Sequence, residues 1–410
     1  MKYVIVVGDG MADYPLPELE EKTPLEVAKT PNMDWLASKG EVWMARTIPP
    51  KMTPASDVGN LSILGYDPRE YYCGRAPLEA ANMGIQLALD EVAFRCNFIT
   101  SDKDILVDYS AGHISSQEAK VLIASLNEEM RREGVRFYAG VSYRHLLILK
   151  DSRYSARMLA TVECIPPHDL TGKNFRKSLP KGEGADLLIE MMEQGRKVLK
   201  DHEINRVRVD LGENPATMIW LWGQGQAPRI PLFKEKYGLT GGVISAVDLI
   251  NGIGRIIGFE VIKVPGATGY YDTNYEGKAD YALEALKKKD LVLIHIEAAD
   301  EASHNGDLRE KMAAIEKIDR LVIGRIMEGL KGVEYRILVM PDHPTAVAKR
   351  SHTADDVPFL IAGTGIVPNG AASYSETSGK SSGMVLEEGY RVMERFIARS
   401  HSSLSSRAIE

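Results

Sequence analysis

Acidic and imidazole side chains follow three apolar, strand-like runs near the two ends of this chain. The runs and the side chains after them are Tyr3–Val7 with Asp9, Leu291–Ile296 with Asp300 and His304, and Ile337–Met340 with Asp342, His343 and, further on, His352. Side chains just past the carboxyl ends of parallel strands lie where open α/β sheets bind their ligands. The three segments therefore predict one shared site at that edge of a sheet.

These side chains predict metal chemistry. Carboxylates and imidazoles suit zinc, manganese and related divalent ions. Asp300 and His304 are four residues apart, so one helical turn places both on the same side. Asp342 and His343 are adjacent, and in a loop at a strand end they can reach two different ions. Two ions about 3.5–4 Å apart can hold both the attacking and the leaving oxygen of a phosphoryl transfer.

A simpler interpretation exists for each of these residues alone. An Asp after a strand, such as Asp9, is more often a turn residue or a helix cap than a ligand. The metal hypothesis therefore depends on the combination, in which three of the nine His lie beside Asp residues and strand ends. The other six show no such grouping and are not expected to bind metal; they are His113, His145, His168, His202, His295 and His401.

Ser56 is the predicted nucleophile. It follows Pro54-Ala55 and opens a short stretch with helical apolar periodicity, so it is expected at a helix N-terminus. Free N–H groups and the positive end of the helix dipole favour a bound phosphate there. The simpler interpretation is an N-cap Ser. A metal ion would make Ser56 more than a cap, because coordination lowers the pKa of a hydroxyl and yields an attacking alkoxide.

Several motifs of the chain occur in the same order in a known family. They are Gly8–Asp13, Thr30–Asp34, Ser56–Ser62, Gly74–Ala80, Asp300–His304 and Pro341–His343. With them the chain resembles, from residue 1 to about residue 395, the cofactor-independent phosphoglycerate mutases of the short, archaeal-type branch of the alkaline phosphatase superfamily. The resemblance implies an α/β fold, with an alkaline-phosphatase-like core whose mostly parallel sheet is flanked by helices, plus an inserted smaller α+β domain.

The resemblance also implies roles for the site residues. Ser56 would be phosphorylated and dephosphorylated in turn as the phosphoryl group moves between the 3- and 2-hydroxyls of glycerate, without bisphosphoglycerate. Two divalent ions, of manganese, magnesium, zinc or cobalt, would serve the reaction. The implied ligand sets are Asp300, His304 and His352 for one ion and Asp9, Ser56, Asp342 and His343 for the other.

Three positions depart from the family pattern. Asn60 stands where many members have His, Ala299 where Pro is usual, and Ser303 where Gly is usual. The chain also resembles a group of sequences that has been proposed as an alternative homoserine kinase in threonine synthesis. The acceptor therefore stays open between glycerate and another small alcohol such as homoserine, and a metal-dependent phosphatase is a further alternative. A catalytically silent binding protein is a third hypothesis, which the intact ligand set opposes.

A small phosphorylated substrate, phosphoglycerate, is expected to bind in a cleft between the two domains. The inserted domain could close over the metal ions there and exclude water. Arg is favoured as a contact because its fork matches phosphate and carboxylate. The candidates, which follow mostly from the resemblance, are Arg75, His113, Arg144 and His145.

Composition agrees with an enzyme of the cytoplasm. At 410 residues, 44% of them hydrophobic and 26% charged, the chain can form two domains with full cores. Fifty basic and 57 acidic residues give a net charge of −7, which disfavours nucleic acid and anionic membranes as partners. The three scattered Cys are expected to stay reduced. Neither a signal peptide nor a membrane span is expected, and the oligomeric state is left open.

The core domain is expected over residues 1–66 and 236–410, with an inserted domain over 67–235. Thr23 and Thr30 each precede Pro and are expected to cap helices of the core. The Ser-rich tail, Ser400–Glu410, is expected to be unstructured.

The inserted domain is expected to mix helices and strands. The Gly223-Gln224-Gly225 segment is expected to end its last strand. The patterns predict strands over 94–99, 145–149 and 217–222 and helices over 116–133 and up to about residue 202.

Overall fold

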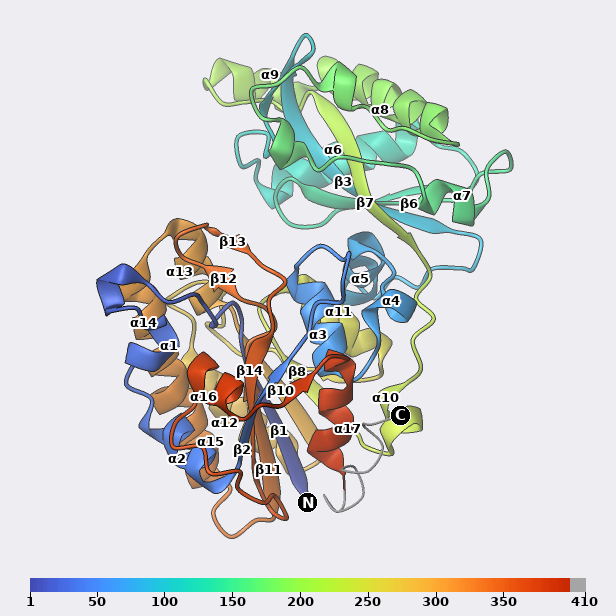
Figure 1. Cartoon of the computed structure of the whole chain (residues 1–410). Helices are drawn as coiled ribbons and strands as arrows, with labels where there is room; N and C mark the ends of the chain where they lie inside the picture. The colour runs from blue at the N-terminus through green and yellow to red at the C-terminus, as the bar shows by residue number, and fades with distance from the viewer. Residues whose placement is uncertain (399–410) are drawn as a thin grey trace. The chain divides into compact units, whose positions relative to one another are not determined.

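The computed structural model describes residues 1–398 and divides into two compact units. Unit 1 comprises Met1–Tyr72 and the described residues from Arg229 onward, and unit 2 comprises Cys73–Pro228. Unit 2 is thus inserted into the sequence of unit 1, and each unit has its own sheet (Figure 1). The tail predicted to be unstructured, Ser400–Glu410, lies outside the described residues.

Unit 1 contains, within residues 1–398, an eight-stranded sheet in the order β15-β2-β14-β11-β1-β10-β8-β9. The strands are β1 (Lys2–Gly8), β2 (Glu41–Ala45), β8 (Gly241–Ile244), β9 (Glu260–Val261), β10 (Leu291–Ile296), β11 (Tyr335–Met340), β14 (Val357–Gly363) and β15 (Val385–Leu386). Strand β1 pairs in parallel with β10 and β11, whereas β14 runs antiparallel to β11 and β2. A separate small pair is formed by β12 (Thr345–Ala346) and β13 (Ser351–His352). The predicted mostly parallel α/β core is confirmed.

Helices cover both faces of this sheet, as Figure 1 shows. Val4 and Val6 of β1 pack in one hydrophobic cluster with residues of α2, α12, α14 and α15. On the other face the Tyr3 ring meets Phe396 of α17, with the centroids 5.5 Å apart. Burial on both faces explains why the central strands consist mostly of apolar residues. The helices of unit 1 are α1 (Pro24–Val27), α2 (Pro31–Lys39), α3 (Ser56–Ile63), α4 (Pro68–Tyr71), α10 (Phe233–Tyr237), α11 (Asp248–Ile256), α12 (Tyr275–Leu286), α13 (Ala298–Asn305), α14 (Leu308–Lys317), α15 (Gly324–Gly329), α16 (Glu376–Ser381) and α17 (Val392–Ile397), with a π-helical segment at Ile318–Ile323 and 3₁₀ turns at Pro17–Leu19 and Gly389–Arg391.

The two predicted Thr caps differ in the structure. Thr23 forms a full capping box with Glu26 at the start of α1, as predicted. Thr30 makes no side-chain cap at α2, so that prediction is wrong. The Asp319 carboxylate takes the place of the cap, because it accepts hydrogen bonds from the backbone N–H groups of Asn32 and Met33 at 3.3 and 2.7 Å. A distant residue therefore satisfies the donors that a local cap would have taken.

Unit 2 is an antiparallel sheet with helices, the α+β mixture expected from its sequence. Strand β3 pairs with β4, β6 and β7, and β5 pairs with β6. The strands are β3 (Val92–Asp102), β4 (Ile105–Asp108), β5 (Val135–Tyr138), β6 (Arg144–Leu149) and β7 (Met218–Gln226). The helices are α5 (Arg75–Asn82), α6 (Ser116–Glu129), α7 (Ala156–Ala160), α8 (Ala185–Lys200) and α9 (Glu203–Asp210), with 3₁₀ turns at Pro167–Leu170 and Phe175–Ser178.

The glycines at 223 and 225 do not end the last strand, contrary to the prediction. Strand β7 continues through them, and Gly225 pairs with Ala93 of β3. A Cβ at position 225 would lie 1.6 Å from the carbonyl oxygen of Cys73. Gly225 is therefore required by the close approach of another backbone segment, which a sequence cannot distinguish from a turn.

Cys73, Cys96 and Cys164 are all free thiols in the structure. In the part of the chain that the structure describes, none of the helices is both long enough and apolar enough to span a bilayer.

Candidate active site with two metal triads

The carboxyl ends of β1, β10 and β11 bring the predicted ligands together. Gly8 at the end of β1 is in register with Ile296 of β10, and Val7 is in register with Met340 of β11. The loops that follow therefore begin at the same level of the sheet. Among residues 1–398, two groups of side chains have ligand atoms that all lie within 4.8 Å of one another: Asp300, His304 and His352, and Asp9, Asp342 and His343.

The first triad, Asp300 with His304 and His352, lies at helix α13 and strand β13. The His304 and His352 Nε2 atoms lie 3.3 and 3.4 Å from the Asp300 carboxylate and 2.9 Å from each other. Their Nδ1 atoms contact the backbone oxygens of Arg350 at 3.0 Å and Pro54 at 3.3 Å. When Nδ1–H donates to a carbonyl, the Nε2 lone pair is left for a metal ion. Both Nε2 atoms face the same carboxylate in this arrangement.

Electrostatics keep Asp300 ionised. Burial acts to raise its pKa, but the hydrogen bonds with His304 and His352 outweigh burial and hold the pKa well below its usual value. The hydrogen bond to Asp300 raises the pKa of His304 in return. The first triad therefore offers one negative charge and two imidazoles, which is a ligand set suited to a divalent ion.

The second triad surrounds the Ser56 hydroxyl. The His343 Nε2 atom lies 3.5 Å from Asp9 Oδ1 and 3.8 Å from Asp342 Oδ2. The Ser56 Oγ donates to Asp9 Oδ2 at 3.2 Å and contacts His343 Nε2 at 3.2 Å. The predicted nucleophile and the predicted ligands of the second ion thus form one cluster.

The second triad has the electrostatics of a cation site. Burial, together with the charges of Asp342 and Asp300, raises the pKa of Asp9 well above its usual value. The Asp9 Oδ1 atom is buried and has no hydrogen-bond partner. Burial lowers the pKa of His343, which keeps its imidazole neutral. A divalent ion would satisfy the unpartnered oxygen and offset the repulsion between carboxylates, so these residues fit a metal ion.

Thr345 links the two triads. Its Oγ1 donates to Asp300 Oδ1 at 2.5 Å and lies 3.2 Å from His343 Nδ1. Because the Thr345 hydrogen goes to Asp300, its oxygen accepts from His343 Nδ1, which leaves His343 Nε2 for a metal ion. The His343 and His352 rings are 4.1 Å apart between centroids, so the two candidate sites are neighbours.

A buried lysine joins the loops that carry the ligands. The Lys311 Nζ donates to Asp13 Oδ2 at 2.8 Å, to the Ala12 carbonyl at 3.2 Å and to the Thr345 carbonyl at 2.8 Å. Asp13 Oδ2 also accepts from the Val347 N–H at 3.1 Å. The loop after β1 and the loop after β11 are therefore connected through one charged pair.

Helix α3 packs closely against the site at a glycine. A Cβ at Gly59 would lie 2.5 Å from the carbonyl oxygen of Asp342 and 2.9 Å from its Cβ. We expect Gly59→Ala to displace Asp342 and to lower both turnover and Mn²⁺ affinity, because misplacing a reacting group by about 1 Å can cost about 100-fold in rate. On an open helix the same change would stabilise the protein by about 1 kcal/mol.

The measurement compares kcat and Mn²⁺ affinity of Gly59→Ala with those of Gly269→Ala, since a Cβ at Gly269 would meet nothing within 4 Å. If Gly59→Ala matched the Gly269 control in both quantities, the close packing of α3 on Asp342 would have no functional role.

Two residues that the sequence did not assign to the site are part of it. His295, near the end of β10, is fully buried, with Nε2 3.5 Å from Asp9 Oδ2 and 3.8 Å from Asp342 Oδ2. Asn60 donates to Asp342 Oδ2 at 2.9 Å and to the Ser56 carbonyl at 2.8 Å. The expectation that His295 groups with no other ligand is wrong. One signal was available: His295 lies at the carboxyl end of one of the three ligand-bearing strands.

The proposed substrate contacts lie in unit 2. His113 and Arg144 are exposed and flank the Tyr143 ring, at 6.3 Å from the His113 ring and 5.7 Å from the Arg144 guanidinium. Arg75 is the first residue of α5. His145, by contrast, is 2% exposed and packs 4.5 Å from the Phe98 ring. Burial lowers the pKa of His145 to about 3.

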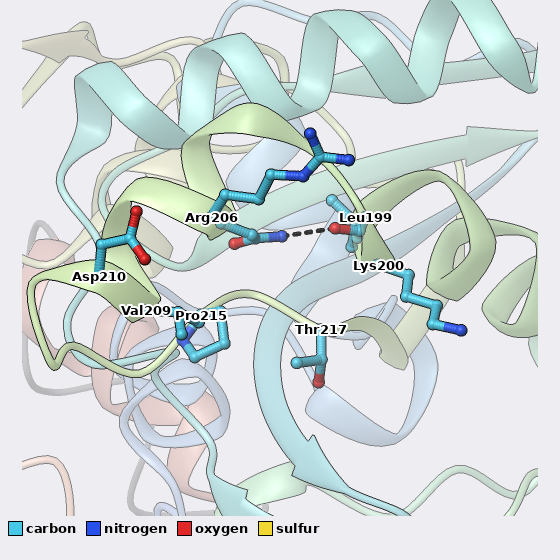
Figure 2. A pocket seen from close by; sticks show the side chains of 8 residues that line it. Leu199, Lys200, Arg206, Val209, Asp210, Pro215 and Thr217 are labelled. Atoms are coloured by element: carbon cyan, nitrogen blue, oxygen red, sulfur yellow. Dashed lines mark hydrogen bonds between the residues drawn. The ribbon is translucent and has the colours of Figure 1, made fainter.

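A pocket of about 330 Å³ on unit 2 lies at the ends of α8 and α9 (Figure 2). The charged side chains that line it are Lys200, Arg206 and Asp210. The Asn205 amide donates to the Leu199 and Ala216 carbonyls and accepts from the Ala216 N–H, so its polar atoms serve the fold. The predicted site residues do not line this pocket.

Comparisons with known proteins agree with this geometry. A family model described as 2,3-bisphosphoglycerate-independent phosphoglycerate mutase matches residues 37–205. The chain is similar to the protein of that name from Methanothrix thermoacetophila, with 51% identity over 400 residues that cover 97% of this chain and 100% of the relative. A solved structure of a Pyrococcus horikoshii protein matches with a TM-score of 0.80 and 30% identity, covering 96% of each chain. The cofactor-independent phosphoglycerate mutase of Thermoplasma acidophilum matches with a TM-score of 0.65 and 27% identity, covering 97% of this chain and 99% of that one.

Proposed function

This chain belongs to the 2,3-bisphosphoglycerate-independent phosphoglycerate mutase family, and from that membership we propose that it interconverts 3- and 2-phosphoglycerate through a phosphoserine at Ser56. The observation that carries the proposal is the position of the Ser56 hydroxyl. It lies 3.2 Å from both Asp9 Oδ2 and His343 Nε2, within the second triad and at the N-terminus of α3. The reaction is a step of glycolysis and gluconeogenesis.

Two divalent ions, of manganese, magnesium, zinc or cobalt, fit the two triads. Asp300, His304 and His352 would hold one ion, and Asp9, Asp342, His343 and Ser56 the other. When bound, the ions would lower the pKa of the Ser56 hydroxyl and neutralise charge on the phosphoryl oxygens.

The chain's own groups prepare Ser56 for transfer. Asp9 Oδ2 accepts the hydrogen bond of the Ser56 hydroxyl at 3.2 Å and orients its oxygen. The N–H groups in the first turn of α3 have no carbonyl partner within the helix, so this end of the helix favours a bound anion. The Asn60 amide donates to both the Ser56 carbonyl and Asp342 and fixes their spacing.

We propose Arg75, His113 and Arg144 of unit 2 as contacts of the substrate. A mutase must keep the dephosphorylated glycerate bound until Ser56 returns the phosphoryl group, and Arg suits its carboxylate. His145 is too deeply buried for a direct contact, so we place it beneath Arg144 as support for strand β6.

Replacing the proposed arginine contacts should release the intermediate. We expect Arg75→Ala and Arg144→Ala to raise KM for 3-phosphoglycerate and to raise the ratio of free phosphate to 2-phosphoglycerate formed, because the glycerate would leave before Ser56 returned the group. Arg157→Ala, at a helix of unit 2 outside the proposed contacts, is the control. An unchanged product ratio in both variants would remove these two residues from the substrate site.

The proposed reaction is tested with purified, Mn²⁺-loaded protein and 3-phosphoglycerate in the absence of bisphosphoglycerate. Formation of 2-phosphoglycerate is expected. A parallel assay supplies homoserine and a nucleotide. Phosphorylation of homoserine without isomerisation would retain the two-metal phosphotransfer chemistry and overturn the mutase proposal.

A further inference from the structure

A fourth histidine lies at the same distances from the carboxylates of the second triad as His343 does, but it faces the other oxygen of Asp9. The His295 Nε2 lies 3.5 Å from an oxygen of Asp9 and 3.8 Å from Asp342 Oδ2. The His343 Nε2 lies 3.5 Å from the other oxygen of Asp9 and 3.8 Å from the same Asp342 Oδ2. Both side chains are fully buried.

His295 also shares the hydrogen-bonding pattern of the triad histidines. In each of these four residues the Nδ1 atom faces an oxygen: that of Arg350 for His304, Pro54 for His352, Thr345 for His343 and Glu297 for His295. Each ring can therefore donate through Nδ1 and offer the Nε2 lone pair. His145 and His202 have the opposite arrangement, because their Nδ1 atoms accept from the backbone N–H groups of Gly140 and Ile204.

Two charged residues hold His295 in this orientation. The Glu297 Oε1 lies 3.0 Å from His295 Nδ1 and accepts from Ser245 Oγ at 2.9 Å. Lys278 is fully buried and donates to Glu297 Oε2 at 3.2 Å and to the His295 carbonyl at 2.9 Å. A carboxylate that orients an imidazole from behind is the usual support of a metal-binding histidine.

We propose that His295 is a further ligand of the metal ion held by Asp9, Asp342 and His343, oriented by Glu297 and Lys278. The inference rests on the proposed metal centre and adds a ligand to it. The Nε2 of His295 would complete the coordination of the ion next to Ser56.

The distances favour coordination over a direct hydrogen bond. N–H···O bonds have heavy-atom distances of about 2.7–3.2 Å, which are shorter than the 3.5 and 3.8 Å found between His295 and the carboxylates. Two ligands at about 2.0–2.2 Å from one ion, at angles of about 109–120°, lie roughly 3.3–3.8 Å apart. The Asn60 amide is 3.3 Å from His295 Nε2, but its two hydrogens have shorter bonds to Ser56 and Asp342.

The first test measures Mn²⁺ binding by equilibrium dialysis and elemental analysis. Wild-type protein should bind two ions per chain. The His295→Leu variant should still bind one ion, at Asp300, and its affinity for the other ion should fall by at least about 100-fold. Glu297→Gln should lower the affinity for that same ion by about 10- to 100-fold. The control is His202→Leu, which removes a histidine of unit 2 outside the site and should bind as wild type does.

The second test needs no substitution and holds even if His295→Leu fails to fold. In Co²⁺-loaded wild-type protein, each ligating imidazole gives a paramagnetically shifted Nδ1–H proton signal that disappears in D₂O. Four such signals are expected, from His295, His304, His343 and His352. Three signals, with two ions bound, would overturn the role of His295 and leave the metal centre intact. A wild-type protein that binds no Mn²⁺ would overturn the metal centre itself.

Discussion

Ser56→Ala is expected to lower the turnover of 3-phosphoglycerate by at least about 1000-fold while the fold remains intact. Removing a nucleophile deletes a covalent route, and such losses reach about a million-fold in other enzymes. The structural cost should be small, because the Ser56 Oγ has one donated hydrogen bond, to Asp9 at 3.2 Å, in a cluster of polar groups. The measurement is kcat with 3-phosphoglycerate, beside thermal unfolding.

A second measurement identifies the covalent species. Wild-type protein quenched during turnover should yield a peptide with the added mass of one phosphoryl group at Ser56, and Ser56→Ala should not. Ser62→Ala is the matched control in the same helix, because its Oγ donates to the Thr47 carbonyl and not to one of the proposed ligands. Turnover of Ser56→Ala above about one hundredth of the wild-type value would exclude Ser56 as the nucleophile.

Removal of divalent ions is expected to abolish activity and to destabilise the protein. Asp9 would be left with an unpartnered buried oxygen beside other carboxylates. Each ion present at 100 times its Kd contributes about 2.7 kcal/mol to the free energy of unfolding, so two ions contribute about 5 kcal/mol. The measurement is activity and unfolding temperature after dialysis against a chelator, and again after addition of Mn²⁺.

Acid should act in the same direction as the chelator. Imidazole and carboxylate ligands bind metal when deprotonated, so affinity should fall as pH decreases through the range in which His304 and His352 gain protons. Interactions with Asp300 raise the pKa of both residues, by a hydrogen bond for His304 and against the effect of burial for His352. Protons therefore begin to compete with the ion at a higher pH than for an ordinary histidine. Full activity in protein shown by elemental analysis to contain no divalent ion would contradict the two-metal proposal.

The sequence by itself determined the strands that carry the ligands. Tyr3–Val7 is an unbroken apolar run and Leu291–Ile296 is apolar except for His295, and the structure places β1 and β10 over them. Central parallel strands are buried on both faces, which leaves this signal in the sequence. The spacing of Asp300 and His304 was also sufficient to predict that both side chains lie on the same side of a helix, because one helical turn depends only on local geometry. In the structure they lie on α13, with Nε2 3.3 Å from the carboxylate.

Only the tertiary structure decided the contacts between residues that lie far apart in the sequence. Asn60 and His295 are 235 residues apart in the chain, and they meet because α3 packs beside the end of β10. Asp319 caps α2 in place of Thr30, and the backbone of Cys73 requires Gly225. Thr345 connects two ligands that belong to different triads. Periodicity and spacing report contacts within a few residues, whereas these contacts depend on packing between distant segments, which a single sequence does not encode in any local pattern.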